Sequence, residues 1–224
     1  MENEIVMEKV IHKGAEANLV YGHWFGKEVI FKNRIPKGYR IEQIDKMLRT
    51  KRTLNEGKAL IRVKSYGINT PQVYEIDTKN STIVMKYIKG QKLKDALNSL
   101  TDEQKVNILK NIGNSIAILH KNGHIHGDIT TSNIILTNAE EIFIIDFGLH
   151  GYSDYIEDKS TDLHLFKRVL ISSHGNDFGL CFEAFLEGYR NGYELENMKE
   201  YKEIIKNIKT IETRGRYVKK EERI

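Results

Sequence analysis

A carboxylate, an amide and a second carboxylate occur in this chain at a spacing that few folds accommodate. Asp128 lies in the segment His126-Gly127-Asp128-Ile129-Thr130-Thr131-Ser132-Asn133, and an apolar stretch then leads to Asp146-Phe147-Gly148. Phosphoryl transfer passes through a highly charged transition state, so it needs one carboxylate to orient the attacking oxygen and further oxygen ligands to hold magnesium. The order of these residues predicts ATP-dependent phosphoryl transfer, with Asp128 catalytic and with Asn133 and Asp146 as magnesium ligands.

Length and composition set the limits for this interpretation. The 224 residues, 40% of them hydrophobic, suffice for one domain or for two closely associated lobes, and two prolines give no sign of a flexible linker. The sequence contains no apolar run of the length that a membrane span needs, and its start does not resemble a signal peptide. Cys181 is the only cysteine, which excludes an internal disulfide and a cysteine-based zinc site. These features predict a cytoplasmic protein.

The sequence pattern changes near residue 88. Before it, β-branched and aromatic runs predict one helix, Ile41–Tyr66, and five strands: Ile5–Ile11, Leu19–Trp24, Val29–Asn33, Gln72–Ile76 and Thr82–Tyr87. After it, a capping box at Thr101 opens a helix that ends near Asn122, and short strands are expected at Ile134–Leu136 and Phe143–Ile145. Three more helices are expected near Thr161–Ser172, Asp177–Asn191 and Glu196–Thr213.

This distribution predicts an α+β fold of the two-lobed, protein-kinase-like kind. Residues 1–87 would form a small lobe of antiparallel sheet with one helix. Residues 88–224 would form a mostly helical lobe with a basic tail from about residue 214. The two lobes together would make one domain that spans the chain.

Lys32 closes the run Val29-Ile30-Phe31-Lys32, which matches the strand lysine that binds the α- and β-phosphates of ATP. A lysine at a strand end is usually just solvated, so this interpretation depends on Asp128 and Asp146. Glu56 is the expected ion-pair partner of Lys32, because it lies in the middle of the predicted helix.

Two further segments are predicted to contact ATP. Gly14, Ala15, Glu16 and Ala17 join the first two strands, where a loop of backbone amides would cover the phosphates. Gly14 is the only glycine there, and an ordinary hairpin turn is an almost equal alternative. Met85 and Tyr87 belong to the second segment, at the predicted hinge between the lobes, under which the nucleotide would lie.

Basic residues and histidines add two open questions. Seven cations lie between Lys46 and Lys64, and the tail contains Arg214, Arg216 and Lys219. Both clusters fit contact with RNA phosphates, and both also fit solvated helix faces. A zinc site at His120, His124 and His126 is a weaker alternative, because these histidines straddle a helix end and a loop with no cysteine nearby. His126 is expected to support the Asp128 loop.

End to end, the chain resembles the small atypical kinase subunit of the KEOPS complex, the PRPK family, a relative of the RIO kinases. The resemblance rests on the Asp128 segment and on Lys37-Gly38-Tyr39-Arg40, Gly67-Ile68-Asn69-Thr70-Pro71, Glu157-Asp158-Lys159-Ser160-Thr161-Asp162-Leu163 and Arg214-Gly215-Arg216. It implies hydrolysis of ATP with Mg2+, in support of a partner that makes N6-threonylcarbamoyladenosine on tRNA. The implied partners are this threonylcarbamoyltransferase subunit, a small KEOPS subunit that docks on the N-terminal lobe, and tRNA.

The chain departs from ordinary protein kinases after Gly148. No Ala-Pro-Glu follows, and about a dozen residues separate Gly148 from the helix predicted near Thr161, too few for an extended activation segment. Thr130 replaces a lysine that many protein kinases carry. A RIO-like serine/threonine kinase is the main alternative. A small-molecule kinase of the aminoglycoside or choline type and a non-enzymatic nucleotide-binding module are weaker ones.

Overall fold

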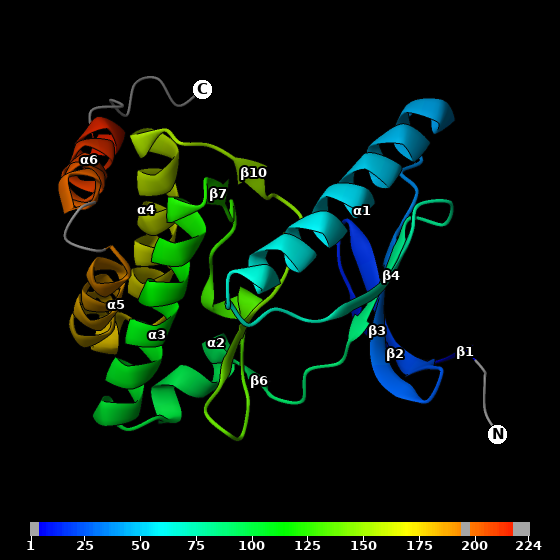
Figure 1. Cartoon of the computed structure of the whole chain (residues 1–224), viewed down its shortest axis with the longest axis horizontal. Coiled ribbons are helices and arrows are strands. Elements are labelled where there is room, and N and C mark those ends of the chain that lie inside the picture. Colours follow the sequence, from blue (N-terminus) through cyan, green and yellow to red (C-terminus); the bar gives the residue numbers. More distant parts are fainter. Residues whose placement is uncertain (1–4, 194–197, 217–224) are drawn as a thin grey trace. The chain divides into compact units, whose positions relative to one another are not determined.

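The computed structural model describes residues 5–193 and 198–216, with side chains up to residue 213 (Figure 1). Contacts divide the chain into two compact units. Unit 1 contains residues 1–89 and 143–148, and unit 2 contains residues 90–142 and 149–224. Within the described ranges, no helix combines the length and the apolar character that crossing a membrane requires. The predicted lobes differ from these units chiefly in residues 143–148, which the prediction placed with the helical part.

Unit 1 is built on a five-stranded antiparallel sheet in the order β1-β2-β3-β5-β4. Its strands are β1 Ile5–Lys13, β2 Ala17–Trp24, β3 Lys27–Arg34, β4 Val73–Asp77 and β5 Thr82–Lys86. The single helix α1 spans Glu42–Ser65 and packs on β4 and β5. All five predicted strands and the predicted helix are confirmed, with ends that differ by one or two residues.

Strand alternation sorts the side chains of β3 between the two faces of this sheet. Phe31 joins Val29 and Val84 in a buried cluster on one face, which Trp24 and Tyr74 border. Lys32 lies on the opposite face, where it reaches α1. The same strand therefore supplies core packing and a buried charge.

Close contact between α1 and β4 depends on one glycine. A Cβ atom at Gly57 would lie 2.5 Å from Cδ1 of Ile76, well inside van der Waals contact. The adjacent Glu56 is 1% exposed. Near the C-terminal end of α1, the Thr70 hydroxyl donates a hydrogen bond to the Leu60 carbonyl. Gly57 thus lets the helix bring Glu56 close to the sheet.

Unit 2 is mostly helical, as predicted, and Figure 1 shows α3, α4, α5 and α6 grouped in it. Its helices are α2 Leu93–Ala96, α3 Asp102–Lys121, α4 Ile156–Ser173, α5 Phe178–Gly192 and α6 Met198–Arg216. Its short strands are β6 Gln91–Lys92, β7 His124–Ile125, β8 Ile134–Leu136 and β10 Gly151–Tyr152, and β9 Ile142–Ile144 begins in it. The α3 capping box is confirmed, because Thr101 Oγ1 accepts from Gln104 N and Gln104 Oε1 accepts from Thr101 N.

One helix start was predicted wrongly. α4 begins at Ile156, five residues before the predicted Thr161. Glu157 and Asp158 form its first turn, where acidic side chains favour a helix through its dipole, although they carry no apolar signal. The segment between Gly148 and α4 is therefore residues 149–155, shorter than the sequence suggested.

Two glycines allow α3 and α5 to pack backbone to backbone in unit 2. A Cβ atom at Gly113 would lie 2.0 Å from the Phe185 carbonyl oxygen, and one at Gly188 would lie 1.9 Å from the Lys110 carbonyl oxygen. Either methyl group would force the helices apart. This close pair forms the centre of unit 2, with α4 packed against α6 and α5.

Candidate active site

Lys32 lies between two carboxylates of unit 1. Its Nζ donates to Glu56 Oε1 at 2.6 Å and to Asp146 Oδ1 at 2.7 Å. The predicted pairing of Lys32 with Glu56 is confirmed. The structure also brings Asp146, 114 residues away in the chain, to the same ammonium group.

Burial of this cluster makes its charges strongly interdependent. Lys32 is 7% exposed and Glu56 is 1% exposed. Burial lowers the pKa of Lys32, but the charges of Glu56 and Asp146 outweigh it and hold this pKa above its ordinary value. The lysine therefore remains a cation at neutral pH, as the binding of phosphate groups requires.

Asp146 reaches this position through a left-handed turn. Its φ is +62°, which is uncommon for a residue with a side chain, and its Oδ1 also accepts from the Gly148 backbone N–H at 3.2 Å. Two residues earlier, Ile144 N donates to the Asn69 carbonyl at 2.9 Å, which ties the segment to unit 1. Phe147 is buried, so the turn has little freedom to open.

Asp128 and Asn133 lie together in unit 2. The Asn133 amide Nδ2 donates to both the backbone carbonyl and Oδ2 of Asp128, each at 2.9 Å. The 3-10 turn Thr131–Asn133 sets this geometry, since Asn133 N donates to the Thr130 carbonyl at 3.0 Å. The asparagine therefore fixes the orientation of the carboxylate that was predicted to be catalytic.

The Asp128 loop is anchored by Asp162 of α4. Its Oδ2 accepts from His126 N at 2.8 Å, and its Oδ1 accepts from Gly127 N at 2.9 Å. Gly127 has a φ of +80°, a conformation that favours glycine. In the sequence, Asp162 stands out only as part of the segment that resembles the KEOPS kinase family. Its anchoring role could not be predicted, because no local pattern shows which distant backbone groups a side chain contacts.

Asp162 is 2% exposed and also lies 3.3 Å from His120 Nε2. Burial raises the pKa of this carboxyl, but the hydrogen bond and charge of His120, with the backbone N–H groups, hold it below its ordinary value. His120 Nδ1 in turn lies 2.8 Å from the Tyr189 hydroxyl. The loop thus rests on an ionised carboxylate inside a hydrogen-bonded network.

The predicted support role of His126 agrees with its geometry. It is 0% exposed, and its Nδ1 accepts from Asp128 N at 3.3 Å. For zinc, the described residues contain no group of three or more His, Cys, Asp or Glu side chains placed to hold a metal. The zinc alternative is accordingly dropped.

Asn133 in unit 2 and Asp146 in unit 1 each offer oxygen atoms of the kind that a hard divalent cation prefers. Magnesium prefers carboxylate and amide oxygens over nitrogen and sulfur. Because the Asn133 amide nitrogen is occupied by Asp128, the amide atom that remains to ligate a cation is its oxygen. Asn133 and the carboxylate of Asp146 are therefore chemically fitted to the metal role, each within its own unit.

The loop residues Gly14, Ala15, Glu16 and Ala17 form a tight connection between β1 and β2. Gly14 N donates to the Ala17 carbonyl at 3.0 Å, as in a hairpin turn. The Glu16 carboxylate accepts from Arg52 at 2.5 Å and from Arg34 at 3.3 Å. Their contact with ATP stays a prediction.

Met85 and Tyr87 lie at the end of unit 1. Met85 is half-buried in β5 opposite Ile30, and Tyr87 N donates to the Glu28 carbonyl at 3.1 Å. Unit 1 ends at Lys89, close to where the hinge was predicted. Their contact with the nucleotide also stays a prediction.

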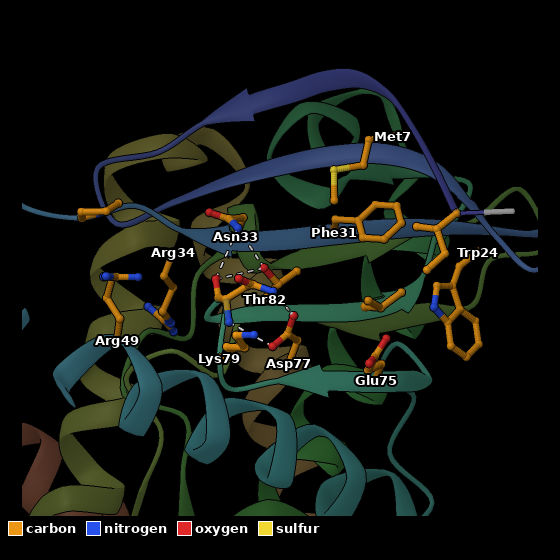
Figure 2. A pocket seen from close by; sticks show the side chains of 14 residues that line it. Met7, Trp24, Phe31, Asn33, Arg34, Arg49, Glu75, Asp77, Lys79 and Thr82 are labelled. Carbon is orange, nitrogen blue, oxygen red and sulfur yellow. Dashed lines mark hydrogen bonds between the residues drawn. The ribbon is translucent and has the colours of Figure 1, made fainter. Parts of the chain in front are cut away.

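A cavity of unit 1 lies away from the Lys32 cluster (Figure 2). It has a volume of about 530 Å3, and neither Lys32, Glu56 nor Asp146 lines it. Met7, Trp24 and Phe31 lie at one end of it, and Arg34 and Arg49 lie at the other. Its apolar part belongs to the face of the sheet opposite Lys32.

The structure describes the side chains of the basic cluster on α1 but not those of the basic tail. On α1, Arg49 pairs with Asp45 and Arg52 pairs with Glu16, whereas Lys46, Lys51, Lys58 and Arg62 are exposed. In the tail, Arg214 and Arg216 fall in the last turn of α6. Their side chains and all of Lys219 lie outside the described residues, so tRNA contact by the tail stays a prediction.

Comparison with known proteins identifies the family. Residues 26–164 match the protein kinase domain. The chain is 42% identical over 215 residues to the KEOPS complex subunit Bud32 of Pyrococcus abyssi, an alignment that covers 93% of this chain and 96% of that protein. It is 40% and 39% identical to probable bifunctional tRNA threonylcarbamoyladenosine biosynthesis proteins of Methanococcus vannielii and Methanocaldococcus jannaschii, over 93% and 95% of this chain.

The chain spans only 36% and 38% of the length of these two bifunctional relatives. The predicted α+β kinase fold is confirmed by the domain match and by the sheet and helices of the two units. Enzymes of this fold family act on ATP with a divalent metal ion. The chain therefore belongs to the protein kinase family and, within it, to the family of the KEOPS complex subunit Bud32.

Proposed function

We propose that this chain is the ATP-hydrolysing atypical serine/threonine kinase subunit of a KEOPS complex. In this role it supports N6-threonylcarbamoyladenosine formation on tRNA, which a partner transferase carries out. The observation that carries the proposal is the Lys32 ammonium group held by Glu56 at 2.6 Å and by Asp146 at 2.7 Å. Kinases of this fold need such a lysine–glutamate ion pair for activity, together with an aspartate that holds the metal ion.

Each residue has a distinct task in the proposed reaction. Lys32, kept charged and oriented by Glu56, binds the α- and β-phosphates of ATP. Asp128, oriented by Asn133, positions the attacking oxygen and accepts its proton. Asn133 and Asp146 hold Mg2+, which when bound neutralises charge on the phosphates.

The same proposal retains the finer assignments of the sequence. Residues 1–87 and 88–224 serve as lobes of one kinase-like domain. Gly14, Ala15, Glu16 and Ala17 contact the phosphates, and Met85 and Tyr87 contact the rest of the nucleotide. The partners are the threonylcarbamoyltransferase subunit, a small subunit on the N-terminal lobe, and tRNA, with Arg214, Arg216 and Lys219 as candidate tRNA contacts.

The short segment after Gly148 favours ATP hydrolysis over phosphorylation of many proteins. Only residues 149–155 precede α4, whereas protein kinases use an extended activation segment to hold peptide substrates. The names of the bifunctional relatives, which join this kind of chain to tRNA threonylcarbamoyladenosine biosynthesis, point in the same direction. Both observations support a transferase partner.

The test is phosphate release from ATP by the purified transferase–kinase complex, measured with and without tRNA. Wild type is compared with Asp128→Ala, and with Glu103→Gln as a control that removes an exposed charge of α3 in the same unit. We expect tRNA to stimulate release, Asp128→Ala to abolish it, and Glu103→Gln to leave it unchanged.

Three results would contradict the proposal. Release that ignores tRNA while a partner protein becomes labelled would assign the chain to RIO-like protein phosphorylation. Release that survives Asp128→Ala would remove this residue from the chemistry. ATP binding without any turnover would leave a scaffold that only binds nucleotide.

A further inference from the structure

A second pocket of unit 1 is rich in cationic side chains. It has a volume of about 170 Å3 and is lined by residues of the β1–β2 loop, the end of β3, the connection from β3 to α1, and the N-terminal half of α1. Its lining residues, which define what we call the arginine pocket, are Ala15, Glu16, Arg34, Ile35, Lys37, Tyr39, Arg40, Arg49 and Arg52. Lys32, Glu56 and Asp146 are not among them, although Ala15 and Glu16 belong to the loop that is proposed to contact the ATP phosphates.

The Glu16 carboxylate shows where an oxyanion fits in this pocket. Arg52 Nη1 donates to its Oε1 at 2.5 Å, and Arg34 Nη1 donates to its Oε2 at 3.3 Å. Half of the Glu16 side chain is exposed, and the residue lies on the three-residue loop between β1 and β2. Because exposed ion pairs contribute little stability, an anion that binds the two arginines more tightly can replace this carboxylate.

Asp45, the other carboxylate nearby, is not replaceable in this way. It is 3% exposed and is held by Arg49 at 2.6 Å, by Arg40 at 3.5 Å and by the Lys37 backbone N–H at 3.3 Å. It does not line the pocket itself, but it orients two of the arginines that do, Arg40 and Arg49.

Positive charge in the arginine pocket exceeds the negative charge that compensates it. The Lys37 ammonium donates to the Ala15 carbonyl, a neutral acceptor, so it does not neutralise a carboxylate there. Glu56 accepts from Arg34 at 2.6 Å, but it shares its charge with Lys32. Five cations of the lining thus face Glu16, Asp45 and part of Glu56: Arg34, Lys37, Arg40, Arg49 and Arg52.

Arg34 also carries a buried N–H group without a partner among the described residues. The residue is 3% exposed, and the atom without a hydrogen-bond partner is its Nε. A buried N–H group without a partner is costly, which is why such groups are usually satisfied. Figure 2 shows the Arg34 side chain next to Arg49, which also lines the arginine pocket.

We propose that the arginine pocket binds a phosphate group, as inorganic phosphate or as a phosphate monoester, in place of the Glu16 carboxylate. Planar guanidinium groups bind phosphate with paired hydrogen bonds, and phosphate offers more oxygens than the carboxylate that it replaces. The volume of the pocket is below the roughly 300–1,000 Å3 of sites that hold drug-sized ligands, which suits a small anion. Binding there releases the Gly14–Glu16 loop from Arg34 and Arg52.

The test is calorimetric titration of the whole chain with inorganic phosphate and, separately, with phosphoserine. Magnesium and a non-hydrolysable ATP analogue are present in excess, so that phosphate cannot report on the nucleotide position. We expect Arg52→Gln to weaken binding about tenfold or more, as loss of a charged hydrogen bond does. We expect Glu16→Gln to tighten it roughly two- to fivefold, because it removes the competing carboxylate.

Lys51→Gln is the matched control, since Lys51 precedes Arg52 on α1, is exposed, and does not line the pocket. Lys51→Gln should leave the affinity for phosphate unchanged. If Arg52→Gln does not fold, Arg40→Gln replaces it as the variant that should weaken phosphate binding. Tighter binding of phosphoserine than of phosphate assigns a monoester ligand, and the reverse assigns free phosphate. Equal affinity in wild type, Arg52→Gln and Glu16→Gln overturns the proposal.

A short single-stranded RNA that binds through Arg52 while neither small phosphate binds would also overturn it, because the ligand would then be a nucleic acid. The inference does not rest on the proposed function. Phosphate binding can still be measured in a chain that binds no nucleotide. Failure of the phosphate proposal is therefore distinguishable from failure of the proposed ATP-hydrolysing function.

Discussion

Replacement of Asp162 by alanine should loosen the Asp128 loop from inside unit 2. The change removes the acceptor of the His126 and Gly127 backbone N–H groups, which lie 2.8 and 2.9 Å from the carboxylate, and the contact with His120 at 3.3 Å. Two amide groups left without partners cost about 1–3 kcal/mol each. Including the broken contact with buried His120, we expect the free energy of unfolding to fall by about 3–5 kcal/mol.

Urea unfolding can follow this loss in each unit. Far-ultraviolet circular dichroism reports mainly on unit 2, which carries five of the α-helices. Fluorescence of Trp24, the only tryptophan, reports on unit 1. Glu183→Ala is the control, because Glu183 is an exposed carboxylate in the middle of α5 in the same unit. A loss below about 1 kcal/mol for Asp162→Ala would refute the anchoring role.

The pH dependence supplies a second check on Asp162. Its folded-state pKa lies below the ordinary value of 3.8, so its contribution to stability is fully present above that value. The contribution is lost as the pH falls through the folded-state pKa. The stability difference between wild type and Asp162→Asn should therefore be constant near neutral pH and shrink in acid. A difference that grows in acid would contradict this sign.

Three more outcomes are expected. Gly188→Ala should lower the free energy of unfolding in urea by about 1–3 kcal/mol, because the new methyl group would lie 1.9 Å from the Lys110 carbonyl oxygen. An unchanged urea midpoint would contradict the close contact between α3 and α5. Burial and the nearby charge of His124 lower the pKa of His150 to about 4, so the free energy of unfolding should rise between about pH 4 and the ordinary histidine pKa of 6.5. His150→Gln should flatten that rise in urea unfolding measured across this pH range. An equally steep rise in the variant would refute the role of His150. Asp146→Ala should remove magnesium-dependent ATP binding measured by calorimetry, while circular dichroism stays native; unchanged binding would remove Asp146 from the metal site.

Local patterns were enough for the elements of unit 1 and for part of the site. The apolar patterns of helix α1 and of all five strands, and the capping box at Thr101, can be recognised within a few residues of sequence. The pairing of Lys32 with Glu56 followed from a motif and a position in the middle of a helix. The start of α4 was missed, because its acidic first turn stabilises a helix without an apolar period.

Contacts between distant segments depended on how the chain folds. Asp162 meets backbone groups 35 and 36 residues earlier, and Arg34 and Arg52 converge on Glu16 from a strand and a helix. No periodicity or motif encodes such partners, because the packing of whole elements decides which side chains meet. The sequence by itself determined most of the secondary structure and the types of the candidate catalytic residues, through short-range propensity and spacing. Only the tertiary structure decided what anchors the Asp128 loop and where the arginines gather, since those depend on contacts made across the fold.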